Sequence, residues 1–248
     1  MLANTRTSPI GTAIRSEIGP LPNPIGSNVM VDLRQVKKDP EVQALIAEAD
    51  RQLEALGYTE HGPRHARLVA KNSRRILIEL GYDKRIAELS AIAGYLHDIG
   101  NVVNRSGHER TSALLAREIL LRLGMAYGEI APIMVAVGNH HEEGGNPISV
   151  IAAALILADK ADVHRSRVRN PALIKFDIHD RVNFAVKKSV LSVDADNRRI
   201  VFALKVDTSI APVMEYFEIF LSRMLISRRA ADFLKCQFEL IINGTKLV

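Results

Sequence analysis

Residues 92–98 have the sequence Ile-Ala-Gly-Tyr-Leu-His-Asp, in which an apolar helical run ends on a histidine and an aspartate. Burying an unpaired carboxylate at the end of such a run would cost several kcal/mol, and a bound cation would offset that cost. A carboxylate has two oxygens and can bridge two metal ions, and mixed nitrogen and oxygen ligands suit Mn, Fe, Zn or Ni. His97 and Asp98 therefore predict a metal centre at the end of this helix.

Helices are predicted on both sides of this stretch. Asp39 is a good N-cap, Pro40 suits the first helical position, and apolar residues then follow helical spacing until Gly57. The same start and stop signals predict further helices over residues 63–80, 83–97, 108–123, 128–137 and 148–168.

Other metal-ligating side chains fall at the ends of these predicted helices: His65, His108, His140, His141 and Asp159. A single histidine at a helix end is more often a cap or a surface residue. Helix ends can converge on one pocket, however, and the joint pattern favours a shared metal site over the separate interpretation of each residue.

Beyond Phe176 the apolar period changes from that of a helix to two. Alternation through residues 182–186 and 200–206, around turn-forming residues 194–197, predicts a β-hairpin. A helix is predicted from Pro212 to about Leu225, followed by a second helical stretch to Lys235 and a last strand over residues 237–242. The expected fold is mainly α, a helical bundle followed by a small C-terminal ββαβ module. Its parts are a loose or disordered leader (residues 1–30), a helical metal-binding domain (31–175) and the module (176–248).

The order and spacing of these elements resemble the HD-domain metal-dependent phosphohydrolase superfamily. The resemblance covers roughly residues 39–169. The leader and the C-terminal module lie outside these residues. It is carried by five ordered elements: residues 65–70 (HARLVA), residues 95–100 (YLHDIG), His108, residues 139–142 (NHHE) and residues 157–159 (LAD).

The resemblance implies a centre with two divalent ions, drawn from Mn, Fe, Ni, Co, Zn and Mg. His65, His97, Asp98 and Asp159 are implied to hold the first ion, with Asp98 bridging to the second. The histidines at 108, 140 and 141 stand where ligands of the second ion are expected. The GYP signature of one diesterase branch is absent, and Asn101 stands where many relatives have a lysine.

The activity implied is hydrolysis of a phosphate monoester or diester, with a nucleotide as the expected substrate, by a metal-activated water. Asp98 and Glu142 are the candidate catalytic residues. Two alternatives remain open: a di-iron oxygenase that uses the same site, and a nucleotide sensor without turnover.

Basic residues follow Asp159 in the predicted helix. Lys160, Arg165 and Arg169 are the candidate phosphate contacts, since the spacing of 165 and 169 would place both on one helical face. Asp162 has two interpretations: it orients a metal ligand, or it forms a surface salt bridge to Arg165 or Arg169.

Composition limits the expected partners and location. The 248 residues include 33 Lys and Arg against 28 Asp and Glu, and aromatic residues make up 5% with no Trp. This favours a phosphorylated small molecule and gives no strong nucleic-acid signal. No apolar run is long enough to span a membrane, and a single cysteine, Cys236, favours a cytoplasmic protein. The strand over residues 237–242 predicts a homodimer if its edge is open.

Overall fold

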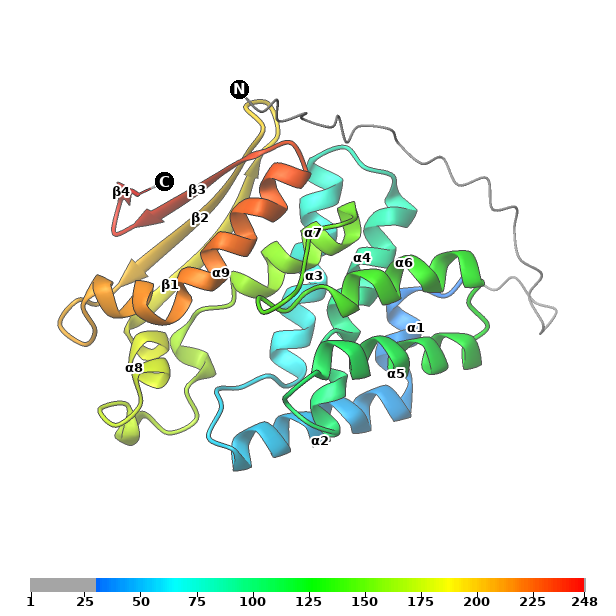
Figure 1. The fold of residues 1–248 in the computed structure, drawn as a ribbon, viewed down its shortest axis with the longest axis horizontal. Coiled ribbons are helices and arrows are strands. Elements are labelled where there is room, and N and C mark those ends of the chain that lie inside the picture. The colour runs from blue at the N-terminus through cyan, green and yellow to red at the C-terminus, as the bar shows by residue number, and fades with distance from the viewer. Residues whose placement is uncertain (1–29, 248) are drawn as a thin grey trace, which may run out of the picture.

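The computed structural model describes residues 30–247. This part of the chain contains nine α-helices and one small four-stranded sheet near the C-terminus (Figure 1). The prediction of a mainly α fold with a small C-terminal sheet module is confirmed. The predicted leader, apart from Met30, lies outside the described residues. None of the helices within residues 30–247 has the length and apolar character that crossing a bilayer requires.

The first seven helices form the larger part of the molecule. They are α1 (Leu33–Lys38), α2 (Pro40–Ala55), α3 (Pro63–Glu79), α4 (Lys84–Leu96), α5 (His108–Arg122), α6 (Tyr127–Gly138) and α7 (Val150–Lys160). A short 3-10 helix, η1 (Ile99–Val102), follows α4. Asp39 caps α2 as predicted, because its side chain accepts a hydrogen bond from the Val42 amide. Helix α1 was not predicted.

Two glycines let the backbone approach closely around η1. A Cβ atom at Gly94 of α4 would lie 3.1 Å from the backbone of Ala70 in α3. A Cβ atom at Gly100 of η1 would lie 2.3 Å from the His108 carbonyl oxygen and 2.4 Å from the Ser112 amide nitrogen. These contacts hold α3 and α5 against the two ends of the His97–Asp98 segment, which places His65 and His108 on either side of it.

The prediction that α7 continues to about residue 168 is wrong, because the helix ends at Lys160. The chain then turns back toward the segment between α2 and α3, and a second 3-10 helix, η2, covers Arg165–Arg167. The buried Arg167 guanidinium donates to the carbonyl oxygens of Asp162 and Glu60, at 2.7 and 3.1 Å. A straight helix could not supply these two acceptors together, so Arg165 and Arg169 do not share a helical face.

The segment before the hairpin also differs from the prediction. A third 3-10 helix, η3 (Pro171–Leu173), precedes α8 (Ile178–Ala185), which replaces the strand predicted over residues 182–186. Asp177 caps α8 by accepting from the amides of His179 and Asp180. The buried Val182 and Ala185 are three residues apart, which is the spacing of one helical face, whereas Phe184 of the predicted alternation is only half-buried.

The sheet has the order β1-β2-β3-β4. Its strands are β1 (Val186–Asp194), β2 (Arg199–Val206), β3 (Gln237–Ile242) and β4 (Thr245–Lys246). The predicted hairpin and last strand are present, but β4 was not predicted and α9 (Val213–Phe233) is one helix rather than two. Strand β3 pairs parallel with β2 and antiparallel with β4. Strand β4 covers only the Ile241–Ile242 end of the predicted open edge, and the homodimer stays a prediction.

Helix α9 joins the sheet to the helical part. It crosses from β2 to β3 and packs against α7, as Figure 1 shows. The buried apolar residues form one cluster that runs from α1 through the sheet. The division at residue 175 remains a prediction, since both parts share this core.

We predict that Gly100→Ala lowers the free energy of unfolding by about 2 kcal/mol or more, because the added methyl group would meet backbone atoms that cannot move aside. Denaturant unfolding measures this change. Gly128→Ala in α6 is the matched control: a Cβ atom there meets nothing within 4 Å, and alanine is the better helix former. Equal stability changes in the two variants would contradict the proposed close approach.

Candidate metal centre

Six of the seven predicted metal ligands come together, although five different helices or their ends carry them. His65 lies in the first turn of α3, and the 97–98 pair directly follows α4. His108 is the first residue of α5, His140 follows α6, and Asp159 lies one residue before the end of α7. Helix ends converge here, as the sequence pattern predicted.

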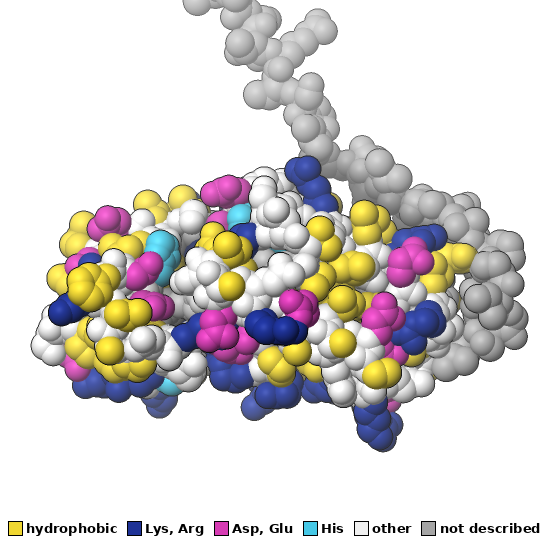
Figure 2. Space-filling view, turned by 90° about the horizontal axis from the view of Figure 1, so that it is seen from below, with side chains coloured by type: hydrophobic (Ala, Val, Ile, Leu, Met, Phe, Trp, Pro, Cys, Tyr) yellow, Lys and Arg dark blue, Asp and Glu magenta, His cyan; other side chains and the backbone are white. Residues whose placement is uncertain are grey.

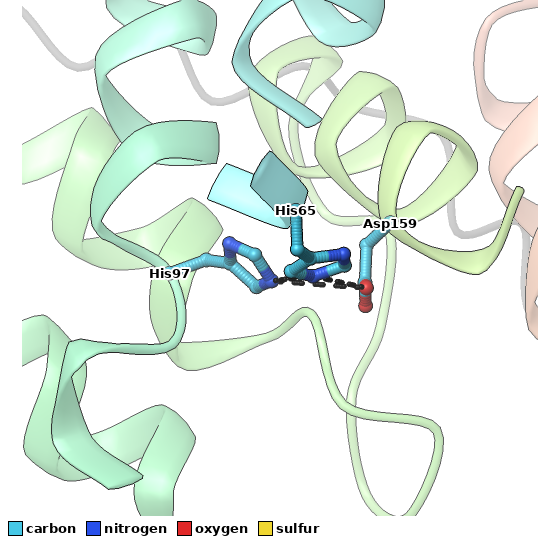
Figure 3. Close-up of side chains that lie close together, drawn as sticks. All are labelled: His65, His97 and Asp159. Carbon is cyan, nitrogen blue, oxygen red and sulfur yellow. Dashed lines mark hydrogen bonds and ion pairs between the residues drawn. The ribbon is translucent and has the colours of Figure 1, made fainter. Parts of the chain in front are cut away.

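One group joins His65, His97 and Asp159, whose side chains point toward one another in Figure 3. The two imidazole Nε2 atoms are 3.2 Å apart. Asp159 Oδ1 lies 3.4 Å from Nε2 of His65 and 3.7 Å from Nε2 of His97. Ligand atoms this close together could hold a metal ion.

A second pair of imidazoles lies on the other side of Asp98. Nε2 of His108 and Nε2 of His140 are 3.3 Å apart. Asp98 Oδ1 lies 3.2 Å from His108 and 3.6 Å from His140, whereas Oδ2 lies 3.3 Å from His97 and 3.6 Å from His65. Each oxygen of one carboxylate therefore faces a different pair of imidazoles.

His141 flanks the second pair without joining it as closely. Its ring centroid is 5.1 Å from that of His108, and its Nδ1 accepts a hydrogen bond from the amide of Glu143 at 3.3 Å. The side chain is only partly buried. Its assignment as a ligand remains a prediction.

Hydrogen bonds donated by Nδ1 fix the orientation of the four imidazoles toward the centre. Nδ1 of His97 donates to the Gly94 carbonyl oxygen at 2.9 Å. In the same way, Nδ1 of His108 donates to the Arg105 carbonyl oxygen at 3.0 Å, and Nδ1 of His140 to that of Val137 at 2.6 Å. Nδ1 of His65 donates to Asp162 Oδ2 at 2.7 Å. Since these partners can only accept, each neutral imidazole carries its proton on Nδ1 and turns the lone pair of Nε2 inward.

Inward lone pairs at such short separations require positive charge between them. Two unprotonated Nε2 atoms cannot hydrogen-bond to each other, so the pairs at 3.2 and 3.3 Å need a proton or a cation. Four such nitrogens with two carboxylates are a donor set that suits a divalent transition metal. The residues present therefore fit bound metal.

Burial and the charges of the centre shift the pKa values of its imidazoles and carboxylates. Burial alone would lower the pKa of His97, but the carboxylates of Asp98 and Asp159 outweigh burial and raise it to about 10. Burial lowers the pKa of His140 to about 4. Burial alone would raise the pKa values of Asp98 and Asp159, but neighbouring imidazoles and Lys160 outweigh it and hold these pKa values well below the usual range. Both carboxylates are thus ionised and demand a cation.

Asp162 is a buried partner of His65 rather than part of a surface salt bridge. Besides its hydrogen bond to His65, it accepts a bidentate pair of hydrogen bonds from Arg64, at 3.2 and 2.8 Å. The alternative pairing of Asp162 with Arg165 or Arg169 is wrong. Burial opposes its charge, but Arg167, His65 and Arg64 hold its pKa far below the usual range. The i,i+3 spacing from Asp159 was the available sequence signal.

The predicted phosphate contacts have different surroundings. Lys160 is buried beside the centre, with Nζ 2.7 Å from Asp159 Oδ2 and 2.6 Å from Glu142 Oε2. Arg165 donates to the carbonyl oxygen of Phe184 and lies over its ring. Arg169 forms an ion pair with Asp50 and donates to the carbonyl oxygen of Tyr58. The structure thus brings only Lys160 of the three to the centre.

A cleft of about 920 Å³ is lined by His61, His141 and Glu142, while none of the six convergent side chains is among its lining residues. Arg105 and Arg223, which the sequence did not single out, also line it. Arg105 reaches the side chain of the buried Asn101 at 3.2 Å and lies 3.4 Å from Nε2 of His108. No local motif marks Arg223, because it lies on α9 outside the resemblance.

The family model described as "HD domain" matches residues 64–163. These residues include all the side chains that converge on Asp98. The chain carries an HD domain. This finding confirms the resemblance seen in the sequence, and the side chains around Asp98 all lie within the matched residues.

Two curated relatives are similar over about half of this chain. An uncharacterized protein of Methanocaldococcus jannaschii is 31% identical over 146 residues, which cover 50% of this chain and 56% of the relative. Ribonuclease Y of Lawsonia intracellularis is 29% identical over 135 residues, which cover 54% of this chain and 24% of the relative. The chain thus spans about half the length of the first relative and about a quarter of the second.

We predict that Asp162→Asn weakens metal binding by about 10- to 100-fold, because the carboxylate no longer orients His65 or raises its basicity. Titration of the metal-stripped protein with Mn or Zn measures this affinity. Asp50→Asn is the matched control, since Asp50 also pairs with an arginine but contacts no imidazole of the centre. An unchanged affinity in Asp162→Asn would argue against its orienting role.

Proposed function

We propose that this chain is a metal-dependent phosphohydrolase with two divalent ions in its HD domain. His65, His97 and Asp159 are proposed to hold the first ion, and His108 and His140 the second. Asp98 is proposed to bridge the two ions, and His141 to complete the second site. The family match supports hydrolase chemistry in general, and the local geometry supports the assignment of residues.

The observation that most strongly supports two ions is the position of the Asp98 carboxylate. Oδ2 faces the imidazoles of His65 and His97, and Oδ1 faces those of His108 and His140. A side chain that served one ion would need only one such pair. Two opposed pairs on a single carboxylate support two ions close together, which is the arrangement that stabilises phosphoryl transfer to water.

Divalent metal bound here would supply Lewis acidity and a water that is nucleophilic at neutral pH. The chain's own groups then have defined tasks. The carbonyl oxygens and Asp162 hold each imidazole with Nε2 inward, as the contacts to Nδ1 support. Lys160 pairs with Oδ2 of Asp159, which leaves Oδ1 to face the first pair of imidazoles.

Glu142 is proposed to position neighbouring cations rather than to donate a proton. Burial opposes its charge, but Lys160 and Arg223 outweigh burial and hold its pKa far below the usual range. A carboxylate that stays ionised at neutral pH cannot act as a general acid. We therefore propose that Glu142, which the sequence predicted as a catalytic residue, instead positions Lys160 and Arg223.

The proposed substrate is a phosphate monoester or diester, with nucleotides as the first class to test. The similarity to a protein named Ribonuclease Y adds RNA diesters to that set. Figure 2 shows acidic and basic side chains next to one another over the middle of this face, and Lys and Arg side chains along its lower edge. The modest net charge of +5 favours a small phosphorylated substrate over a long nucleic acid.

A hydrolysis screen on protein of known metal content tests this function. Metal-stripped protein is reloaded with Mn, Co, Ni, Zn or Fe, and phosphate release is measured with nucleotides, dinucleotides, short RNA and aryl phosphates. We expect turnover that depends on two equivalents of metal. Oxygen uptake by iron-loaded protein without phosphate release would favour the di-iron oxygenase instead. Tight nucleotide binding without turnover would favour the sensor.

We predict that Asp98→Ala loses both ions and at least a hundredfold in activity, since this carboxylate faces both sites. His108→Ala is the matched variant, and it should keep about one ion because the group around His65 remains. Metal analysis of the purified variants gives both counts. Two ions retained by Asp98→Ala would refute the bridging assignment.

A further inference from the structure

We propose that Arg223 of α9 binds a phosphate oxygen of the substrate, so that the C-terminal module forms part of the active site. The proposal rests on the proposed function in one respect, namely that the anion is a phosphate ester. It extends that function to a residue outside the HD match, which ends at residue 163.

The fold places α9 beside the centre. Helix α9 packs against α7, which carries Asp159 and Lys160 (Figure 1). Phe220 and Arg223 are neighbours on one face of α9, and both line the cleft that also contains His141 and Glu142. The cleft therefore has one wall from the HD domain and one from the C-terminal module.

Arg223 is held in place but keeps donors for a ligand. Its guanidinium carbon lies 4.7 Å from the centroid of the Phe220 ring, and its Nε is 3.4 Å from Glu142 Oε1. Within residues 30–247, the ion pair of Arg223 is made by Nε and not by its Nη atoms, and the side chain is 19% exposed. A planar guanidinium fixed by a ring and a carboxylate is well suited to bidentate binding of phosphate.

The charge around Glu142 also favours an anion. Its carboxylate faces both Lys160 and Arg223, and Lys160 also pairs with Asp159. Asp159 is itself proposed as a metal ligand, so its negative charge is shared with an ion. One glutamate then remains beside two cations at this point, although the cleft lining as a whole holds three arginines and four carboxylates.

The competing explanation is that Arg223 only fastens the loop over residues 139–146 to α9. Another arginine of the same helix already does this. Arg229 donates to Asn146 Oδ1 at 3.1 Å and to the Gly145 carbonyl oxygen at 3.4 Å, and it does not line the cleft. Arg229→Ala therefore shows what loss of a loop contact alone would cause.

The test measures binding of inorganic phosphate to the metal-loaded full chain by calorimetry, with metal content determined in parallel. We expect Arg223→Ala to weaken phosphate binding about tenfold or more, through loss of charge-assisted hydrogen bonds, without changing the metal content. Arg223→Lys should recover part of the loss. Arg228→Ala, at an exposed position of α9, should leave binding unchanged. For any ester that is hydrolysed, Arg223→Ala should raise KM and leave kcat within about threefold.

Several outcomes would overturn the proposal. These are phosphate binding unchanged in Arg223→Ala, loss of metal in that variant, an equal loss of binding in Arg229→Ala, or no phosphate binding by the wild-type chain. Failure of the proposed function is a separate result. If the wild-type chain hydrolyses no ester, but Arg223→Ala still weakens phosphate binding with its metal intact, the anion site stands and the hydrolase proposal falls.

Discussion

The carboxylate of Asp98 is the constraint on which the rest of the centre depends. It is almost fully enclosed, ionised, and contacted by imidazoles at both oxygens. Such a group is stable inside a protein only with compensating positive charge. The four neighbouring imidazoles turn Nε2 toward it, because Nδ1 of each is hydrogen-bonded elsewhere. A cation is therefore the partner that this arrangement accepts best.

The helices are arranged so that their ends, and not their faces, meet at this carboxylate. Gly94 allows α3 to pass close to α4 and Gly100 allows α5 to approach η1, which sets the distances from Asp98 to His65 and to His108. Backbone carbonyl oxygens near these ends then orient three of the imidazoles. The backbone thus does much of the positioning that side chains do in other metal sites.

The C-terminal module is more than an addition to the HD domain. Helix α9 shares the hydrophobic core, contacts α7 and lines the cleft beside the centre. If Arg223 binds a substrate phosphate as proposed, substrate recognition by this chain depends on both the HD domain and α9.

The sequence by itself determined the order of helices α2 to α7, the hairpin and strand β3, the HD resemblance, and the six side chains that meet at the centre. These follow from local signals, namely capping residues, apolar period, and histidines and aspartates at helix ends. Only the tertiary structure decided that α7 stops at Lys160, that residues 178–185 are helical, and that β3 is paired on both sides. The roles of Asp162 and Arg223 were decided in the same way. These features depend on partners that are distant in sequence, which local patterns do not encode. Examples are Glu60, which accepts a hydrogen bond from Arg167 after the end of α7, and Glu142, which pairs with Arg223.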